Sequence, residues 1–208
     1  VINQWKGQRY LWHQMLAQNG VIVASFDNRG TGSRGEEFNK QVYRQLGILE
    51  TSDQIQVAEF LGERSFVDKS RIMTWGWSYG GYLSSMIITS GTDFIKAAVA
   101  VAPVTHWKFY DTIYTERYMG TPVSNISNYE KTSPMNHVEK MKGELLLIHG
   151  TGDDNVHYRN SDLFQKKLEE AGKRSTLITI DDEAHSLSGK RLKVYNDITS
   201  FIFTQLKN

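Results

Sequence analysis

The chain has 208 residues, with 24 lysines and arginines against 23 aspartates and glutamates, which gives a formal net charge of +1. Apolar residues make up 39% and charged residues 23%, a globular balance that excludes intrinsic disorder. The chain lacks cysteine, which excludes disulfides, thiolate metal sites and cysteine nucleophiles. Its near-neutral charge and short apolar runs indicate that this segment binds neither nucleic acid nor a membrane.

Taken in chain order, short apolar runs alternate with amphipathic stretches. The apolar runs predict strands at 21–26, 71–76, 96–102, 144–149 and 175–180. The amphipathic stretches predict helices at 53–61 with Ser52 as the cap, and at 79–89, 162–171 and 190–206. The last helix is expected to bury one apolar face made of Leu192, Tyr195, Ile198, Phe201 and Ile202. This alternation predicts an α/β fold, a mostly parallel sheet with helices on both faces.

One long segment, about 105–142, departs from this alternation. It is polar and aromatic, contains Pro122 and Pro134, and has no sustained period, so we expect an irregular insertion. Insertions of this length in a compact domain usually serve as lids or binding loops. The sequence therefore predicts one domain over residues 1–208 with a single insertion.

The strongest chemical motif is the G-x-S-x-G run from Gly76 to Gly80, placed between a predicted strand and a predicted helix. This context is what a nucleophile elbow requires, because the sharp turn lifts the Ser78 hydroxyl clear of the sheet. The glycines leave room for close approach of the backbone, and the N–H groups at the helix start face developing negative charge. The motif indicates an α/β-hydrolase fold with Ser78 as the nucleophile.

A serine nucleophile needs a base to take its proton and an acid to orient that base. In α/β-hydrolases the three residues follow in the order serine, acid, histidine, on loops after successive strands. The loop after 144–149 holds Asp153 and Asp154 as candidate acids, and Asp153 is favoured because it comes first and follows Gly152. Asp154 remains an alternative.

The chain has six histidines, and position decides between them. Only His185, in the loop after the strand 175–180, fits the order expected for the base. His149 lies inside a strand, where it is expected to pack or form a hydrogen bond. The other four are in the wrong segments or follow the acid on its own loop: His13, His106, His137 and His157.

We expect no metal and no cofactor. The glycine-rich run 30–35 lacks the pattern of a phosphate-binding loop, and no histidine or carboxylate cluster has the spacing of metal ligands.

Several longer runs resemble the prolyl oligopeptidase family, in its dipeptidyl peptidase branch. They are SFDNRGTG near the start, GWSYGGY around Ser78, YDTIYTERYMG from Tyr110, HGTGDDNVH from His149 and DEAH ending at His185. The resemblance covers almost the whole chain. The YTERYMG and HGTGDDNVH segments are more specific than the elbow, which alone indicates only a serine hydrolase.

The resemblance implies a role for each site residue. Ser78 would be the nucleophile, Asp153 the orienting acid and His185 the general base, with the backbone N–H of Tyr79 in the oxyanion hole. Asn155 would hold a substrate carbonyl. Besides Tyr79, the slot for proline or alanine at the second substrate position would be lined by Val104, Trp107, Tyr110, Tyr114 and Val156.

The activity so implied is a serine exopeptidase that releases N-terminal dipeptides after Pro or Ala through an acyl-enzyme. Its substrate would be a peptide with a free N-terminus, and the resemblance suggests a periplasmic, cell-surface or secreted protein. A homodimer is one candidate for the oligomeric state, which the sequence leaves open. The resemblance also places the first strands, a second oxyanion donor, the glutamates that bind the amino terminus and a β-propeller before Val1. The segment alone is therefore expected to be poorly active.

Three alternatives stay open at this point. An acylaminoacyl peptidase or an esterase of the same fold would use the same serine, acid and histidine. A non-catalytic, hydrolase-like binding domain would keep the fold without the reaction.

Overall fold

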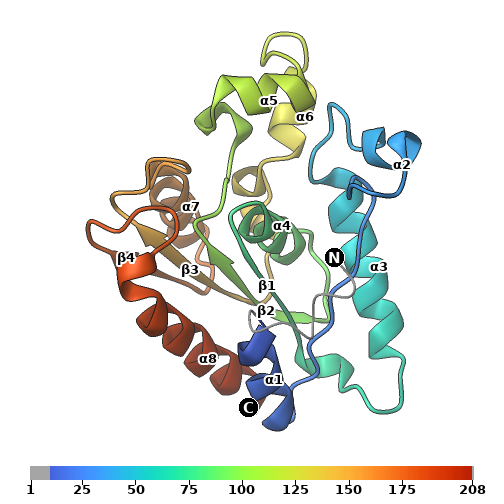
Figure 1. Cartoon of the computed structure of the whole chain (residues 1–208), viewed down its shortest axis with the longest axis vertical. Helices are drawn as coiled ribbons and strands as arrows, with labels where there is room; N and C mark the ends of the chain where they lie inside the picture. The colour runs from blue at the N-terminus through green and yellow to red at the C-terminus, as the bar shows by residue number, and fades with distance from the viewer. Residues whose placement is uncertain (1–9, 208) are drawn as a thin grey trace.

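A four-stranded parallel sheet forms the centre of the structure, a computed structural model that describes residues 10–207 (Figure 1). Its strands are β1 (Ile72–Trp77), β2 (Ile95–Val101), β3 (Glu144–Gly150) and β4 (Ser175–Ile180). They lie side by side in chain order, and every neighbouring pair is parallel. Each strand lies within one residue of its prediction at either end, so the predicted parallel sheet is confirmed.

The four predicted helices are also present. They are α3 (Ile48–Gly62), α4 (Tyr79–Ile88), α7 (Arg159–Glu170) and α8 (Arg191–Lys207). Two further helices, α1 (Leu11–Gln18) and α2 (Glu36–Lys40), were not predicted. Short segments of this kind carry too few turns for a clear period.

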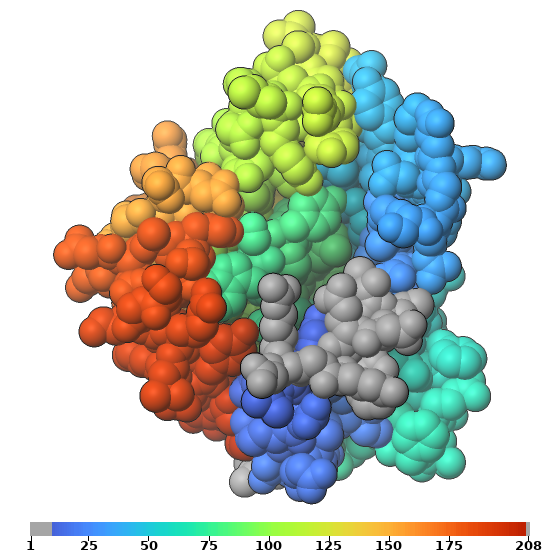
Figure 2. Space-filling view, viewed as in Figure 1, coloured from blue at the N-terminus to red at the C-terminus, as the bar shows by residue number. Residues whose placement is uncertain are grey.

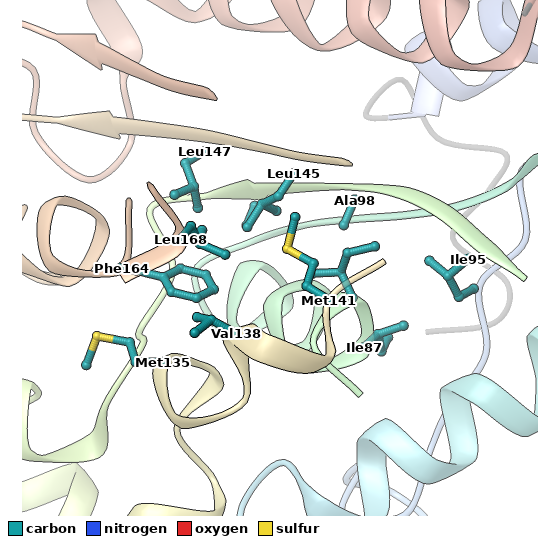
Figure 3. Packing of buried hydrophobic residues seen from close by; sticks show 12 residues of the cluster. Ile87, Ile95, Ala98, Met135, Val138, Met141, Leu145, Leu147, Phe164 and Leu168 are labelled. Atoms are coloured by element: carbon teal, nitrogen blue, oxygen red, sulfur yellow. The ribbon is translucent and has the colours of Figure 1, made fainter. Parts of the chain in front are cut away.

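Two buried clusters show why helices cover both faces of the sheet. Because side chains alternate along a strand, Ala98, Ala100, Leu145 and Leu147 point to one face, where they pack with residues of α4 and α7. Figure 3 shows this cluster between the strands and the helices beneath them. The intervening residues, Val99, Val101, Leu146 and Ile148, point to the other face and pack against α1 and α8.

The predicted strand at 21–26 is wrong. This segment forms no strand, although Val21 and Val23 pack against the second cluster. A strand needs a neighbour for its backbone N–H and C=O groups, and within residues 10–207 the ladder of β1 pairs with β2 alone. Apolar side chains here find burial without a hydrogen-bonded partner strand.

Two details of the helices also differ from prediction. Ser52 is not a cap, because α3 begins four residues earlier, after Gly47, whose φ of 89° suits glycine. In α8, Leu192 is 77% exposed, whereas Val194 is fully buried with Ile198. The buried face of α8 is therefore rotated at its start relative to the predicted face.

The insertion is more regular than predicted. It contains α5 (Thr112–Met119), α6 (Ile126–Lys131) and three short 3₁₀ turns, at Trp107–Phe109, Pro134–Asn136 and Val138–Lys140. The part of the insertion that contains α5 forms the upper end of the molecule, in yellow-green (Figure 1 and Figure 2). The insertion is tied to the preceding part of the chain by the amides of Asn125 and Asn128, which both donate to the carbonyl of Arg44.

Among residues 10–207, none of the helices is long and apolar enough to cross a membrane.

Candidate active site

Ser78 occupies a strained turn between β1 and α4. Its φ of 59° and ψ of −116° lie outside the regions that a side-chain-bearing residue prefers, and its N–H donates to the carbonyl of Val101 at 2.8 Å. A Cβ at Gly76 would lie 2.2 Å from the backbone carbon of Gly80, so the turn closes only with glycine at 76. The turn does not require glycine at position 80 for steric reasons, because a Cβ there would meet nothing within 4 Å.

Backbone strain gathers at one edge of the sheet. Besides Ser78 after β1, positive φ values occur at Ala102 directly after β2, and at Asp182 and Leu187 in the loop after β4. Such conformations cost on the order of 1–3 kcal/mol each and concentrate at functional sites. The carboxyl ends of parallel strands share this edge, which is where open α/β sheets bind their ligands.

Asp153 lies in the loop after β3 and is only 4% exposed. One of its carboxylate oxygens, Oδ1, accepts the N–H groups of Asn155 at 3.0 Å and Val156 at 2.8 Å. The other, Oδ2, faces His185 Nδ1 at 2.7 Å and His149 Nε2 at 3.1 Å. The neighbouring Asp154, the alternative acid, is exposed. The structure therefore brings Asp153 and His185 together, and it does not bring Asp154 to the histidine.

The electrostatics of Asp153 favour its charged form. Burial alone would raise the pKa of this carboxyl, and it is the largest single effect. The hydrogen bonds from His149, His185 and the Val156 N–H outweigh it together, so the pKa of Asp153 lies well below its usual range. Asp153 is thus a carboxylate at neutral pH.

His185 is held beside the Ser78 turn. The indole N–H of Trp77, the residue before Ser78, donates to the carbonyl of His185 at 3.0 Å. Because the carboxylate of Asp153 can only accept, His185 Nδ1 carries a hydrogen, so in the neutral form of the ring Nε2 is the nitrogen with the lone pair. The Ser78 hydroxyl makes no hydrogen bond within residues 10–207; in ligand-free sites such bonds often tighten only when substrate binds.

Tyr79, the first residue of α4, links the turn to α3. Its hydroxyl donates to Glu50 Oε1 at 2.6 Å, while Glu50 Oε2 accepts the N–H of Gly47 at 2.9 Å. Glu50 is 2% exposed, and burial raises its pKa as it also raises that of Tyr79. The first turn of α4 leaves the N–H groups of Tyr79 and its successors without intrahelical acceptors.

Sequence reasoning missed Glu50. The expectation that His149 packs or forms a hydrogen bond is confirmed, but its bond to Asp153 was not predicted. A glutamate in the first turn of a helix has no chemical signature beyond favourable capping, so nothing in the sequence ties it to Tyr79. His149 offers a weak signal, since it ends a strand and comes four residues before the candidate acid.

The residues predicted to line a substrate slot gather in one aromatic cluster. Val104, Trp107 and Val156 are buried in it, and Tyr79, Tyr110 and Tyr114 pack against it. The rings of Trp107 and Tyr114 are stacked at 6.0 Å between centroids. Tyr110 donates its hydroxyl to Asn155 Oδ1 at 2.9 Å, which joins the insertion to the loop of Asp153.

Within the described part of the chain, no group of three or more acidic or histidine residues could hold a metal ion.

Comparisons with known proteins give the family. The sequence profile described as the prolyl oligopeptidase family matches residues 9–208. The chain belongs to the prolyl oligopeptidase family. Its similarity to one relative of this family, dipeptidyl peptidase 4 of Felis catus, is 42% identity over 200 residues, 93% of the chain. It is 43% identical to the venom dipeptidyl peptidase 4 of Vespula vulgaris over 90% of the chain.

The structure agrees with this membership. The crystal structure of Porphyromonas gingivalis dipeptidyl peptidase 4 superposes with a TM-score of 0.92 and 43% identity, over 94% of the chain. Human prolyl endopeptidase FAP, which is 41% identical over 92% of the chain, is a further relative in the prolyl oligopeptidase family. The chain spans about a quarter of the length of these relatives, with 25% to 28% of each covered.

Proposed function

We propose that this chain is the catalytic part of a serine peptidase that releases N-terminal dipeptides after proline or alanine. The observation that carries the proposal is the hydrogen bond between buried Asp153 and His185, on a loop fixed beside the Ser78 turn by Trp77. Relatives named dipeptidyl peptidase 4, at 42% and 43% identity, support the reaction class.

In the first step of the proposed reaction, Ser78 attacks the carbonyl carbon of the second substrate residue. The Ser78 hydroxyl proton passes to the free Nε2 of His185, and the negative charge of Asp153 stabilises the imidazolium that results. The carbonyl oxygen becomes an oxyanion. We propose that this oxyanion accepts a hydrogen bond from the backbone N–H of Tyr79 at the start of α4.

The tetrahedral intermediate then collapses. The bond between the carbonyl carbon and the leaving nitrogen breaks, and His185 gives its proton to that nitrogen, so the shortened peptide leaves with a new amino terminus. The dipeptidyl group remains as an ester on Ser78. Water, deprotonated by His185, attacks this ester, and the dipeptide leaves as Ser78 regains its proton.

We assign specificity for a small ring or methyl group to the aromatic cluster. Val104, Trp107, Tyr110, Tyr114 and Val156 would line a shallow slot next to Tyr79, and Asn155 would hold a substrate carbonyl. Proline suits such a slot because it buries an apolar ring against aromatic faces and loses little rotamer freedom.

A second candidate function, prolyl endopeptidase activity, is favoured by one observation. The human relative that is 41% identical carries the name prolyl endopeptidase FAP. Endopeptidase, acylaminoacyl peptidase and esterase activities would all accept substrates whose amino terminus is blocked, whereas the proposed exopeptidase needs a free one.

A matched pair of substrates separates these functions. The intact protein is given a Gly-Pro chromogenic amide with a free amino terminus and the same amide with the terminus acetylated. We expect the free form to be hydrolysed at least about tenfold faster than the acetylated form. A tenfold difference corresponds to roughly 1.4 kcal/mol of difference in transition-state binding. Faster cleavage of the acetylated form would overturn the exopeptidase proposal, and peptide binding without turnover of either form would favour a binding domain.

We also propose a location in the periplasm or at the cell surface. The relative named venom dipeptidyl peptidase 4 supports this assignment, since venom is a secreted fluid. Cell fractionation with immunodetection tests it, and recovery of the protein in the cytoplasmic fraction would contradict it. Homodimerisation stays a prediction that light scattering on the intact protein can check.

A further inference from the structure

We propose that His149 is a positioning residue for the reaction, a second imidazole that holds the Asp153 carboxylate in the orientation His185 needs. The inference rests on the proposed function, because it concerns the acid of the proposed triad. His149 is fully buried at the end of β3, and its Nε2 lies 3.1 Å from Asp153 Oδ2, the same oxygen that accepts from His185 Nδ1.

The contacts of His149 fix where its proton lies. Nε2 faces two atoms that can only accept, the carboxylate of Asp153 at 3.1 Å and the carbonyl of Val156 at 2.8 Å, so Nε2 carries a hydrogen. Nδ1 lies 2.7 Å from Ser161 Oγ on α7, which can donate to it. A single Nε2 hydrogen shared between Asp153 Oδ2 and the Val156 carbonyl, with the Ser161 hydroxyl donating to Nδ1, accounts for these contacts.

His149 is itself held rigidly, which a positioning residue requires. Ser161 is fully buried behind it, and the ring of Tyr158 packs against the imidazole with centroids 5.7 Å apart and planes at 78°. The imidazole thus connects α7 to the loop after β3. Its N–H fixes the rotation of the Asp153 carboxylate, while the N–H groups of Asn155 and Val156 hold the opposite oxygen.

Because both histidines bond Asp153 Oδ2, His149 also affects the electrostatic attraction between Asp153 and His185. A donor from His149 draws charge from Oδ2 and weakens its attraction for a protonated His185. Asp153 lies between the two imidazoles, and Tyr158 packs beside His149. On the side of His185, Arg191 of α8 donates to the carbonyl of the neighbouring Ser186. Of these, only Asp153 bonds both histidines.

Three substitutions of His149 distinguish the effect of its Nε2–H donor from the effect of its ring volume. In His149→Gln the side-chain amide nitrogen can occupy the place of Nε2 and keep the donor. In His149→Asn the amide reaches only the place of Nδ1, so the bond to Asp153 is lost. In His149→Phe the ring volume stays and both nitrogens are lost. Thermal unfolding of each variant shows whether it folds.

The readout is the rate at which a fluorophosphonate labels Ser78, measured across pH in the intact protein and normalised to the total amount of labelled protein at completion. This normalisation counts only folded, reactive molecules. We expect His149→Phe and His149→Asn to label about 10- to 100-fold more slowly at neutral pH, the range for a hydrogen bond to a charged group. We expect the labelling rate of His149→Gln to lie within about threefold of the rate of the parent protein.

The pH profile supplies the result that a merely structural role would not produce. Without the donor on Oδ2, the half-maximal point of the acid limb should move to higher pH in His149→Phe and His149→Asn, and it should stay in place in His149→Gln. An unchanged acid limb and rate in His149→Phe would overturn the inference. So would a His149→Gln variant that is folded and as slow as His149→Phe.

The parent protein keeps this inference separate from the proposed function. If the parent is labelled at Ser78 and cleaves the free Gly-Pro amide, a negative result for the His149 variants refutes only the role of His149. If the parent is not labelled at Ser78, the proposed function itself fails.

Discussion

At the scale of single residues, the two adjacent aspartates provide a direct comparison. Asp153 is buried and bonded to His185, whereas Asp154 is exposed. In Asp153→Asn the amide cannot orient the Nδ1 proton of His185 as a carboxylate does, so the wrong tautomer is favoured. We expect the hydrolysis rate of a Gly-Pro amide to fall by about 10³- to 10⁴-fold.

The control for this prediction is Asp154→Asn, which removes a charge from the same loop without touching His185. Its rate should stay within about twofold, as expected for an exposed surface substitution. A comparable loss of rate in both variants, or a loss only in Asp154→Asn, would contradict the assignment of the acid.

At the scale of secondary-structure elements, the turn between β1 and α4 makes different demands on its glycines. In Gly76→Ala the new Cβ would lie 2.2 Å from the backbone of Gly80, so the elbow must move. We expect a loss of about 1–3 kcal/mol in the free energy of unfolding, or more. In Gly80→Ala the Cβ enters open space in a helix, and a gain of up to about 1 kcal/mol is expected.

Urea denaturation of the two variants measures both effects. Equal stability of Gly76→Ala and the parent would show that the turn tolerates a side chain at 76, against the geometry described above. A large loss in Gly80→Ala would show that the first turn of α4 is more crowded than the structure indicates.

The elements also show how far the sequence predicts this fold. Strands such as 144–149 were predicted to within one residue because a fully buried parallel strand is a continuous apolar run. The segment 21–26 is also an apolar run and forms no strand, since pairing depends on a partner strand that local composition does not reveal. The helices of the insertion were missed because their faces are mixed, with Ile113 of α5 and Ile126 of α6 exposed.

The candidate site also contains residues that the sequence predicts and residues that it does not. The order of Ser78, Asp153 and His185 along the chain, each after a strand, was enough to predict that they share one sheet edge. Contacts between residues that the fold brings together from different elements have no signal in the local sequence. Glu50 meets Tyr79 only because α3 packs against α4, and His149 meets Asp153 only because the loop after β3 turns back on its strand.

At the scale of the whole molecule, the site contributes to stability in a pH-dependent way. The pKa of Asp153 is lower in the folded state than in an unfolded chain, so its stabilising contribution is complete above the unfolded value of about 3.9. That contribution is lost as the pH falls through the folded value. The stability difference between the parent and Asp153→Asn should therefore be largest near neutral pH and narrow below about pH 4.

Unfolding of both proteins in urea at about pH 6, 4 and 3 checks this prediction. The stability difference between the parent and Asp154→Asn, the matched control, should show no comparable narrowing. A difference between the parent and Asp153→Asn that stays constant down to about pH 3 would contradict the depressed pKa.

The most direct test of the central claim identifies the residue that a fluorophosphonate modifies. The intact protein is labelled, digested and mapped by mass spectrometry, alongside Ser78→Ala and His185→Gln. The account predicts a single modified residue, Ser78, with no label in Ser78→Ala and a rate at least about 10³-fold lower in His185→Gln. Modification of another serine, or an undiminished rate in His185→Gln, would contradict it.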